Sequence, residues 1–286
     1  MSNIGNDATI GFLSGDWMPR SEMRIALEDF AFLQGVTAVE RLRSYGGKLF
    51  QVPAHLARLQ RCLTGLQIDA ADYDFDSLLR ELVVRNADWI ATQTAFGVTL
   101  FVTPGLFHAD QPTVGLHCNA LDPVRIARHQ HEGQPLVLTD VHQPSERCWP
   151  RSWKVRTRLH YYLADQAARR VHPEALGVLR DDDGSLTETS VANLAIVAGE
   201  TIVSPPRDRV LPGITQEFLQ RHARLEGIPW RHQPLRPAEL RQADEILLFG
   251  TTAGVWNGYC DDSDLRPPAG GGPMCRRLRA AFPHGG

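Results

Sequence analysis

The sequence predicts an α+β fold that is divided into two domains. Stretches with helical spacing of leucine alternate along the 286 residues with short apolar runs that are typical of strands. No period of about 20 to 50 residues repeats, which argues against solenoids and propellers. A polar stretch with prolines and little periodicity follows residue 123. We therefore expect a small N-terminal α+β domain over residues 1–122, a linker over 123–129 and a larger C-terminal domain over 130–286.

The composition is that of an ordinary globular protein. Hydrophobic residues make up 43% of the chain and charged residues 22%, which excludes a long disordered chain. The formal net charge is −3, from 30 cationic and 33 acidic side chains, so we expect no nucleic acid and no membrane as partner. No apolar run reaches the roughly 18 residues of a membrane-spanning helix, and residues 1–20 do not resemble a signal peptide. We expect a cytoplasmic protein whose five cysteines are reduced.

The first domain is expected to combine a hairpin, two helices and a further strand. Residues 36–45 and 48–52 read as two strands joined by a turn at Gly46 and Gly47. Residues 53–68 carry leucines at helical spacing and begin with a proline, which the first turn of a helix accepts. A second helix is expected over residues 75–88 and a strand over 96–103.

The second domain is expected to be rich in strands. Residues 135–141 read as its first strand, and a helix follows with Leu159, Leu163, Ala167 and Val171 on its apolar face. Hairpins are expected from the short runs 175–180, 185–188, 194–197 and 201–204. A helix over 216–226, a buried strand over 245–249 and a short basic helix at the end complete the domain.

The usual short catalytic motifs are absent. GxGxxG, GxxxxGK[ST], HExxH and GxSxG do not occur, which disfavours Rossmann dehydrogenases, P-loop enzymes, zincins and α/β-hydrolases. His129 and His131 could face one way on a strand and bind a metal, but no third ligand stands at a recognisable spacing. We therefore expect no metal site.

Lysine is unusually rare in this chain. Only Lys48 and Lys154 occur, so the other 28 of the 30 cationic residues are arginine. An amine differs from a guanidinium because it can lose its proton when desolvated and form a Schiff base. Lys48 flanks the expected glycine turn, where a solvated cation is common. Lys154 stands shortly before a helix of the second domain and is the better candidate for chemistry.

Three further features accompany Lys154 in the second domain. Glu188 lies at the end of an expected hairpin strand, the turn 213–215 opens a helix, and Thr251 follows a strand end with Thr252 beside it. An amine, a buried carboxylate and two turns with N–H and hydroxyl donors are what pyridoxal phosphate needs for its aldehyde, its ring nitrogen and its phosphate. A surface lysine, a strand-end charge and a plain helix cap remain the alternatives for these residues taken singly.

The order and the amino-acid sequences of these segments, over roughly residues 27–278, resemble those of the class IV aminotransferases. This family of fold-type IV enzymes includes branched-chain and D-amino acid aminotransferases and aminodeoxychorismate lyases. The resemblance implies a small α/β domain, a larger β-rich pseudo-barrel domain, pyridoxal 5'-phosphate in the cleft between them, and a homodimer. It also implies a role for each residue that matches a family motif.

Most of these roles concern the cofactor. Lys154 falls on the Schiff-base lysine, Glu188 on the carboxylate for the pyridine nitrogen, and Asn193 on the amide of the same TE-small-small-x-N-Leu run. The motif LPGIT at residues 211–215 places Leu211 against the ring and the N–H groups of Ile214 and Thr215 on the phosphate. Two further phosphate contacts are implied: Arg58 of the motif HLARL, and Thr251.

The substrate side departs from the family pattern. Phe32 stands where relatives often have tyrosine, and Pro104 stands where D-amino acid aminotransferases place the arginine that holds the substrate carboxylate. Leu159 replaces a tyrosine whose hydroxyl bonds the cofactor, so that Tyr161 or Tyr162 would have to supply this group. The sequence GVW at residues 254–256 is similar to a stretch of some aminodeoxychorismate lyases. Substrate contacts are expected from three residues: Phe32, Thr252 and Ala253.

The resemblance implies transamination between an amino acid, or an amine, and a 2-oxo acid through a Schiff base on Lys154. Two alternatives remain open. The first is an aminodeoxychorismate lyase that releases pyruvate and 4-aminobenzoate with the same lysine and cofactor. The second is a protein that binds pyridoxal phosphate without turnover, which the missing arginine and tyrosine would allow.

Overall fold

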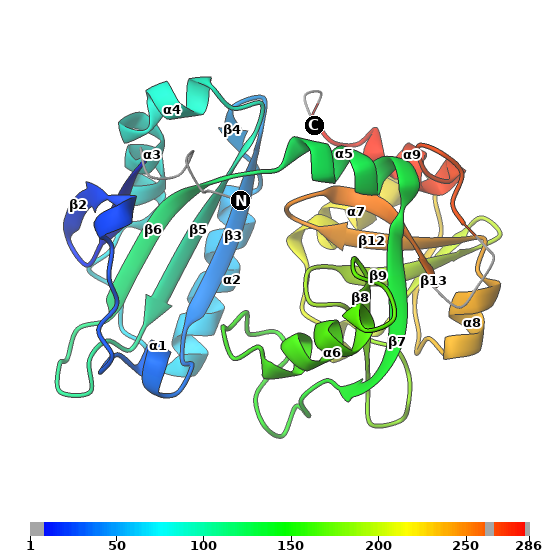
Figure 1. Cartoon of the computed structure of the whole chain (residues 1–286), viewed down its shortest axis with the longest axis horizontal. Coiled ribbons are helices and arrows are strands. Elements are labelled where there is room, and N and C mark those ends of the chain that lie inside the picture. The colour runs from blue at the N-terminus through cyan, green and yellow to red at the C-terminus, as the bar shows by residue number, and fades with distance from the viewer. Residues whose placement is uncertain (1–8, 261–265, 284–286) are drawn as a thin grey trace. The chain divides into compact units, whose positions relative to one another are not determined.

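The computed structural model describes residues 9–260 and 266–283. Its contacts divide the chain into two units, each of which is considered separately (Figure 1). Unit 1 comprises Met1–Pro123, Trp153–Thr157 and Pro283–Gly286, and unit 2 comprises Val124–Ser152 and Arg158–Phe282. The short segment Trp153–Thr157, which contains Lys154, thus belongs by its contacts to the N-terminal unit.

Unit 1 is built on a six-stranded antiparallel sheet with the order β2-β1-β6-β5-β3-β4. Its strands are β1 (Ile10–Leu13), β2 (Asp16–Pro19), β3 (Ala38–Tyr45), β4 (Lys48–Leu49), β5 (Phe96–Thr103) and β6 (Thr113–Ala120). The helical elements are η1 (Arg20–Glu22), α1 (Phe30–Leu33), α2 (Val52–Leu66), α3 (Phe75–Arg85) and α4 (Ala87–Ala91). The expected strand 48–52 is shorter than predicted, because the chain turns into α2 at Val52, one residue before its proline.

The core of unit 1 lies between this sheet and helices α2 and α3. Side chains of a strand alternate between the two faces of its sheet. In β3 the buried Ala38 and Leu42 join Leu59 and Leu63 of α2 and Leu82 of α3 in one apolar cluster. Val39, Arg41 and Arg43 occupy the alternate positions of β3 and therefore point to the opposite face, which the two helices leave uncovered.

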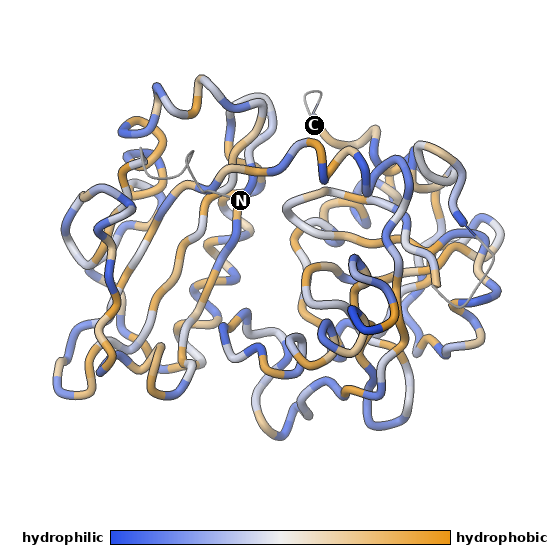
Figure 2. Tube along the Cα trace, in the orientation of Figure 1, coloured by the Kyte–Doolittle hydropathy of each residue, from blue (hydrophilic) through white to orange (hydrophobic). Residues whose placement is uncertain are grey.

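Unit 2 contains a seven-stranded mixed sheet with the order β11-β10-β9-β12-β13-β7-β8. Its strands are β7 (Gln134–His142), β8 (Leu176–Arg180), β9 (Asn193–Ala198), β10 (Thr201–Ser204), β11 (Trp230–His232), β12 (Glu245–Gly250) and β13 (Gly254–Cys260). The helical elements are α5 (Pro123–Glu132), α6 (Leu159–Arg169), η2 (Arg207–Arg209), α7 (Ile214–Leu225), α8 (Pro237–Gln242) and α9 (Pro273–Arg279). Hydrophobic residues concentrate along the strands, as Figure 2 shows.

Three expectations for unit 2 differ from the structure. Residues 123–129 form the first turns of α5, so His129 and His131 lie on a helix and not on a strand. No group of three or more metal-binding side chains occurs among the described residues. Residues 185–188 make isolated bridges, Arg180 with Leu186 and Glu188 with Asn193, and no regular strand.

The apolar face predicted for α6 is also wrong. Leu159, Leu163 and Val171 are 67%, 47% and 60% exposed, whereas Ala164 and Ala168 are buried. A Cβ atom on Gly177 of β8 would lie 2.4 Å from the carbonyl oxygen of Ala164. The helix therefore approaches the sheet so closely that only alanine and glycine fit between them, and the larger side chains face outward.

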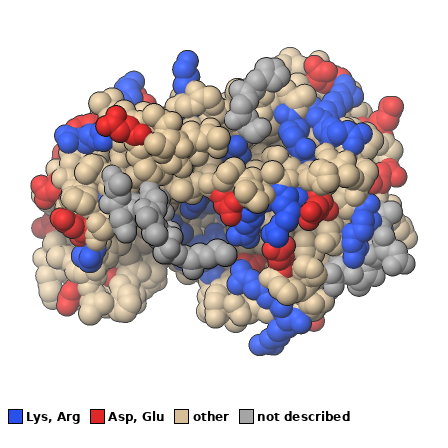
Figure 3. All heavy atoms as spheres, turned by 45° about the horizontal axis from the view of Figure 1, so that its top comes forward, with Lys and Arg blue, Asp and Glu red and all other residues tan. Residues whose placement is uncertain are grey.

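The surface agrees with the balanced composition. On the face drawn in Figure 3, Lys and Arg side chains are interspersed with Asp and Glu. Within the described part of the chain, no helix combines the length and the apolar character that a membrane crossing requires.

Candidate active site

Glu188 is buried in unit 2 among neutral hydrogen-bond donors. Glu188 is 3% exposed to solvent. Oε1 accepts hydrogen bonds from Gln143 Nε2 at 3.0 Å and from the Tyr161 hydroxyl at 2.7 Å. Oε2 accepts one from Asn193 Nδ2 at 3.0 Å, and the N–H of Leu211 lies 3.3 Å from both oxygens. Segments distant in sequence therefore converge on this one carboxylate.

Tyr161 acts as a hydrogen-bond donor to Glu188, because its hydroxyl keeps its proton. Burial raises the pKa of its phenol well above the ordinary value, and the charge of Glu188 and the hydrogen bond to it raise the pKa further. The guanidinium carbon of Arg158 lies 4.4 Å from the centre of the Tyr161 ring. The hydroxyl therefore stays protonated and keeps its proton directed at Glu188. Tyr162, the other tyrosine considered from sequence, is 60% exposed.

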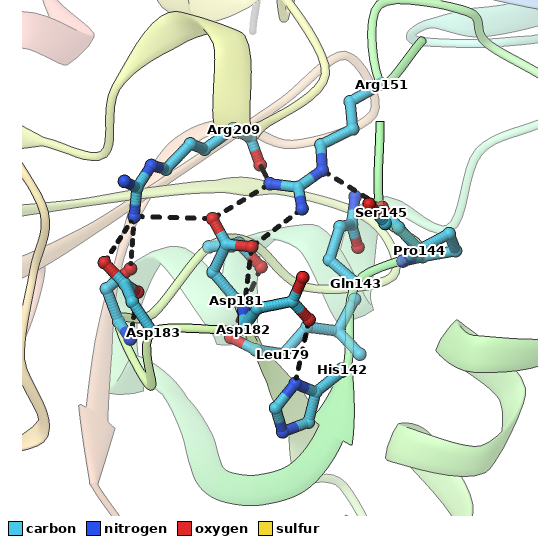
Figure 4. A network of polar contacts seen from close by, with 12 residues as sticks. His142, Gln143, Pro144, Ser145, Arg151, Leu179, Asp181, Asp182, Asp183 and Arg209 are labelled. Carbon is cyan, nitrogen blue, oxygen red and sulfur yellow. Dashed lines mark hydrogen bonds and ion pairs between the residues drawn. The ribbon is translucent and has the colours of Figure 1, made fainter. Parts of the chain in front are cut away.

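A polar network around Arg151 and Asp181 joins the segments of unit 2 that carry Gln143 and Arg209 (Figure 4). Arg151 is buried and bonds both oxygens of Asp181, at 2.7 and 3.0 Å. Its Nε donates to the carbonyl of Pro144 at 3.1 Å, and Nη1 donates to the carbonyl of Arg209 at 3.2 Å. One guanidinium thus joins the segment that carries Gln143 to the segment that carries Leu211.

Arg209 extends this network to the surface. Its Nη1 donates to Asp183 Oδ2 at 2.7 Å and lies 3.4 Å from Asp181 Oδ2. Hydrogen bonds from Arg151 lower the pKa of the Asp181 carboxyl, although burial opposes this shift. The turn 181–185 is therefore anchored by paired charges, which gives the acidic run at residues 181–183 a structural role.

The turns 188–193, 211–215 and 250–252 meet in unit 2. Asn193 Nδ2 donates to the carbonyl of Leu211 at 2.8 Å, and Asn193 pairs with Phe249 at the end of β12. A Cβ atom on Gly213 would lie 1.8 Å from Asn193 Oδ1, and one on Gly250 would lie 2.7 Å from the carbonyl oxygen of Val191. Glycine is thus required where these turns approach one another most closely.

The N-terminus of α7 opens from one of these turns. Gly213 is its N-cap and supplies no side chain to bond the N–H groups of the first turn. Ile214 and Thr215 are buried there, and Thr251 is half-buried at the end of β12. Six buried polar side-chain atoms of unit 2 have no hydrogen-bond partner among the described residues, and three of them are Gln143 Oε1, Ser190 Oγ and Trp256 Nε1.

Lys154 lies in the segment of unit 1 that runs beside β3. Its carbonyl oxygen accepts the N–H of Val39 at 2.9 Å, and the N–H of Arg156 donates to the carbonyl of Thr37 at 3.0 Å. The Cys62 thiol lies 3.9 Å from the same Lys154 oxygen. Strand β3 therefore fixes the backbone of the lysine, whose side chain is half-buried.

A second buried glutamate, Glu40, lies in unit 1. Nε of Arg58 donates to Glu40 Oε1 and Nη2 donates to Oε2, both at 2.7 Å, and His55 Nδ1 lies 2.7 Å from Oε2. Burial raises the pKa of Glu40, but the Arg58 charge and the hydrogen bonds from Arg58 and His55 outweigh it and lower the pKa to about 2. Burial lowers the pKa of His55. The carboxylate thus fixes the guanidinium of Arg58 in two bonds.

The structure distributes the predicted site residues over both units. Unit 2 brings together one set through the contacts above: Glu188, Asn193, Leu211, Ile214, Thr215 and Thr251. Thr252 and Ala253 follow in the same turn, where Gln130 Nε2 donates to the Ala253 carbonyl at 3.0 Å. Arg58, Lys154 and Phe32 belong to unit 1, and Phe32 is 68% exposed on α1.

Sequence reasoning missed two of the residues that surround these sites. Glu40 was recognisable as the one acid in the sequence Ala38–Tyr45, three positions after Thr37. Gln143 gave no signal, since its contact with Glu188 joins residues 45 positions apart.

Comparison with known proteins identifies relatives over nearly the whole chain. The model of the family "Amino-transferase class IV" matches residues 37–257. Aminodeoxychorismate lyase of Bacillus subtilis is 26% identical over 248 residues, which cover 83% of this chain and 81% of that protein. D-alanine aminotransferase of Staphylococcus aureus is 27% identical over 282 residues, 95% of each chain.

Solved structures establish the fold. Branched-chain amino acid aminotransferase of Escherichia coli superposes with a TM-score of 0.86 at 21% identity and covers 96% of this chain and 93% of that one. A hypothetical aminotransferase of Mycobacterium tuberculosis in its pyridoxal phosphate-bound form gives a TM-score of 0.82 at 20% identity, over 95% and 96% of the two chains. The α+β fold of fold type IV that the sequence predicts is confirmed.

The family model spans most of the chain and agrees with the resemblance found in the sequence. Enzymes of this class use pyridoxal 5'-phosphate, so the predicted enzyme class and cofactor are confirmed as well. The chain therefore belongs to the class IV aminotransferase family.

Proposed function

We propose that this chain transfers an amino group between an amino acid, or an amine, and a 2-oxo acid, with Lys154 as the residue that holds the cofactor. The structural observation that carries this proposal is the burial of Glu188 among four neutral donors. Neutral donors stabilise an ionised carboxylate without cancelling its charge. Such a carboxylate suits a protonated ring nitrogen.

The residues of unit 2 fit the rest of the cofactor. The first-turn N–H groups of α7 have no side-chain cap, and a helix N-terminus favours a phosphate. We assign the phosphate to the N–H groups of Ile214 and Thr215, to Thr251 and to Arg58, and the ring to the side chain of Leu211. Asn193 supports both Glu188 and the carbonyl of Leu211. The unpartnered atoms of Gln143, Ser190 and Trp256 provide further polar groups in this unit.

When bound, pyridoxal phosphate supplies an aldehyde that carries the amino group and a ring that accepts electrons. Lys154 Nζ would attach the cofactor, and the same amine would take a proton from the substrate Cα and return it. Glu188 keeps its negative charge next to the ring nitrogen. Tyr161 keeps that carboxylate in one orientation, because its raised pKa prevents it from losing the proton that it donates.

The remaining assignments concern substrate, assembly and location. We assign contacts with the substrate to Phe32, Thr252 and Ala253. The relatives act, by their names, on D-alanine and on branched-chain amino acids, which makes small and apolar amino acids the first substrates to test. We propose a homodimer, as the family resemblance implies, and a cytoplasmic location, which the five free cysteines support.

The two lysines of the chain make the test unusually clear. Protein loaded with pyridoxal phosphate is reduced with borohydride, digested and analysed by mass spectrometry, so that the modified lysine is read directly. The proposal requires the label on the peptide of Lys154. Lys154→Ala should lose both the visible absorbance of the bound cofactor and all amino transfer, while Lys48→Ala, at an exposed position, should keep both.

The lyase alternative has one relative in its favour, the aminodeoxychorismate lyase of Bacillus subtilis. An aminotransferase given only an amino donor converts its cofactor to the amine form and stops. A lyase releases pyruvate and 4-aminobenzoate from aminodeoxychorismate with no oxo acid present. Repeated turnover of aminodeoxychorismate without an oxo acid would overturn the assignment of transamination.

A further inference from the structure

A row of polar side chains crosses the face of the unit 1 sheet that α2 and α3 leave uncovered. Arg41 of β3 is paired with Thr99 of β5, and Thr99 is paired with His117 of β6. Because directly paired residues of neighbouring strands point to the same face, the three side chains lie side by side. Arg20 of η1 and Arg156, two residues after Lys154, act electrostatically on the same row.

Two arginines of this row, Arg41 and Arg20, have no acidic partner among the described residues. Within the described part of the chain, the guanidinium groups of Arg41 and Arg20 make no hydrogen bond and no ion pair. Burial and the charge of Arg20 lower the pKa of Arg41. Burial lowers the pKa of His117 to about 4, against a hydrogen bond to the Cys118 carbonyl, and the charges of Arg20, Arg41 and Arg156 lower it further. The charges of Arg20, Arg41 and Arg156 therefore all oppose protonation of His117.

A half-buried arginine without a counter-charge destabilises the folded chain unless an anion binds to it. A guanidinium matches a carboxylate especially well, because two parallel N–H groups meet the two oxygens. The basic row is confined to one face of one sheet in a chain of net charge −3, so a small anion fits it better than a polyanion.

The neighbouring row of the same sheet is apolar. Val39 pairs with Phe101, and Phe101 pairs with Gly115. A Cβ atom on Gly115 would lie 2.1 Å from Cζ of Phe101, so the Phe101 ring lies over this glycine. An anion-binding row therefore adjoins an apolar one, which is the pattern of an amino acid or oxo acid with one carboxylate and a hydrocarbon part.

Strand β3 also connects this face to the lysine. Val39 donates its N–H to the carbonyl of Lys154 at 2.9 Å, and Arg41 is the next residue of β3 on the same face as Val39. Pro104, which follows the end of β5, has no charge to offer. Among the described residues, Arg41 is the arginine of β3 on this face whose guanidinium makes no hydrogen bond and no ion pair.

We propose that Arg41 binds the carboxylate of the substrate, with Arg20 and Arg156 strengthening the attraction and with Val39 and Phe101 contacting the hydrocarbon part. This inference rests on the proposed amino transfer for the identity of the anion. It makes Arg41 a specificity-determining residue that distinguishes amino acids and oxo acids from simple amines.

The test compares Arg41→Met with Arg61→Met, a matched control at an exposed position of α2. For pyruvate as acceptor, Arg41→Met should raise KM about ten- to a hundredfold, the range expected for a lost charge-assisted pair. Arg41→Lys should recover part of the loss. The half-reaction with isopropylamine, a donor without a carboxylate, should change less than about twofold. Arg61→Met should match the parent protein in each assay.

A binding measurement separates this inference from catalysis. Pyruvate is titrated into the cofactor-loaded protein while the ring signals of His117, assigned with His117→Gln, are followed by NMR. The signals should shift with saturation in the parent protein and stay fixed in Arg41→Met. Unchanged KM in Arg41→Met, or equal NMR shifts in both proteins, overturns the role of Arg41 and leaves amino transfer standing. A shift that depends on Arg41 in a protein that transfers no amino group supports the carboxylate site and contradicts the proposed function.

Discussion

Two buried glutamates, Glu40 in unit 1 and Glu188 in unit 2, are surrounded by different kinds of donor. Glu40 is 0% exposed and receives both hydrogen bonds of the Arg58 fork and one contact from His55. Glu188 is 3% exposed and is bonded by an amide of Gln143, a phenol, an amide of Asn193 and a backbone N–H. The first carboxylate is paired with a cation, and the second accepts hydrogen bonds from four neutral donors.

This difference distinguishes a carboxylate that positions another side chain from a carboxylate that acts on a ligand. A carboxylate that a guanidinium neutralises can hold that guanidinium in position, but it has little charge left to act on a ligand. A carboxylate held by neutral donors still attracts a cation in a surrounding of low dielectric. We therefore expect substitutions at Glu40 to affect mainly the stability of the protein and substitutions at Glu188 to affect mainly the reaction.

The largest expected effect is on stability. Glu40→Gln leaves the buried Arg58 charge without its partner and should lower the free energy of unfolding by about 3 to 5 kcal/mol. Glu188→Gln replaces the carboxylate by a neutral amide among neutral donors and should lower the free energy of unfolding by about 1 to 3 kcal/mol. Urea denaturation of both variants and the parent measures this. Equal losses in the two variants would contradict the distinction between the two sites.

Low pH should remove the stabilisation that the ionised Glu40 gives to the folded protein, because it protonates this carboxylate. The folded-state pKa of Glu40, about 2, lies below its ordinary value of 4.5, so its contribution to stability is complete above pH 4.5 and is lost as the pH falls toward 2. The gap in unfolding free energy between the parent and Glu40→Gln should therefore be constant above pH 4.5 and narrow below it. A gap that persists unchanged to the lowest pH at which both proteins fold would show that the charge of Glu40 is not the cause.

Replacing both partners sharpens the role of Arg58. The double variant Glu40→Leu with Arg58→Met removes the charge and its counter-charge together and should recover most of the stability lost in Glu40→Gln. If Arg58 also contacts the phosphate, the cofactor affinity should stay low in this stable protein. Measured dissociation constants equal to that of the parent would limit Arg58 to a structural role.

The smallest expected effect concerns one neutral donor of Glu188. Tyr161→Phe removes a single hydrogen bond at 2.7 Å, of about 0.5 to 1.5 kcal/mol, and should slow amino transfer roughly two- to tenfold. Tyr162→Phe, on an exposed residue of the same helix, is the matched control and should react at the parent rate. An effect of equal size in both variants would mean that the helix is perturbed as a whole.

The sequence predicted those elements whose pattern is local. Strand Phe96–Thr103 was predicted with the bounds that the structure gives, and α3 begins at the predicted residue. Strands β6 and β13 were missed because glycine, asparagine and histidine interrupt their alternation. The buried face of α6 was wrong, since the close approach of Gly177 to Ala164 cannot be read from the helix alone.

In the candidate site too, contacts between residues close in sequence were predicted and contacts between distant residues were not. Glu188 and Asn193 are five residues apart and were predicted as parts of one motif, and the structure joins them through a hydrogen bond. The contacts of Gln143 and Tyr161 with the same carboxylate span 45 and 27 residues and depend on how β7 and α6 pack. The basic row of β3 and β6 was not predicted either, because it arises from the pairing of strands through β5.

The most direct test of the central claim is the single-turnover rate of Glu188→Gln with an amino donor. Loss of a charge-assisted hydrogen bond, at about 1.5 to 3 kcal/mol, corresponds to a rate lower by about ten- to a hundredfold. The cofactor dissociation constant should change less in Glu188→Gln than in Arg58→Ala or Thr215→Ala. If Glu188→Gln reacts at the parent rate with its cofactor fully bound, the buried carboxylate takes no part in the reaction and the assignment of this site is wrong.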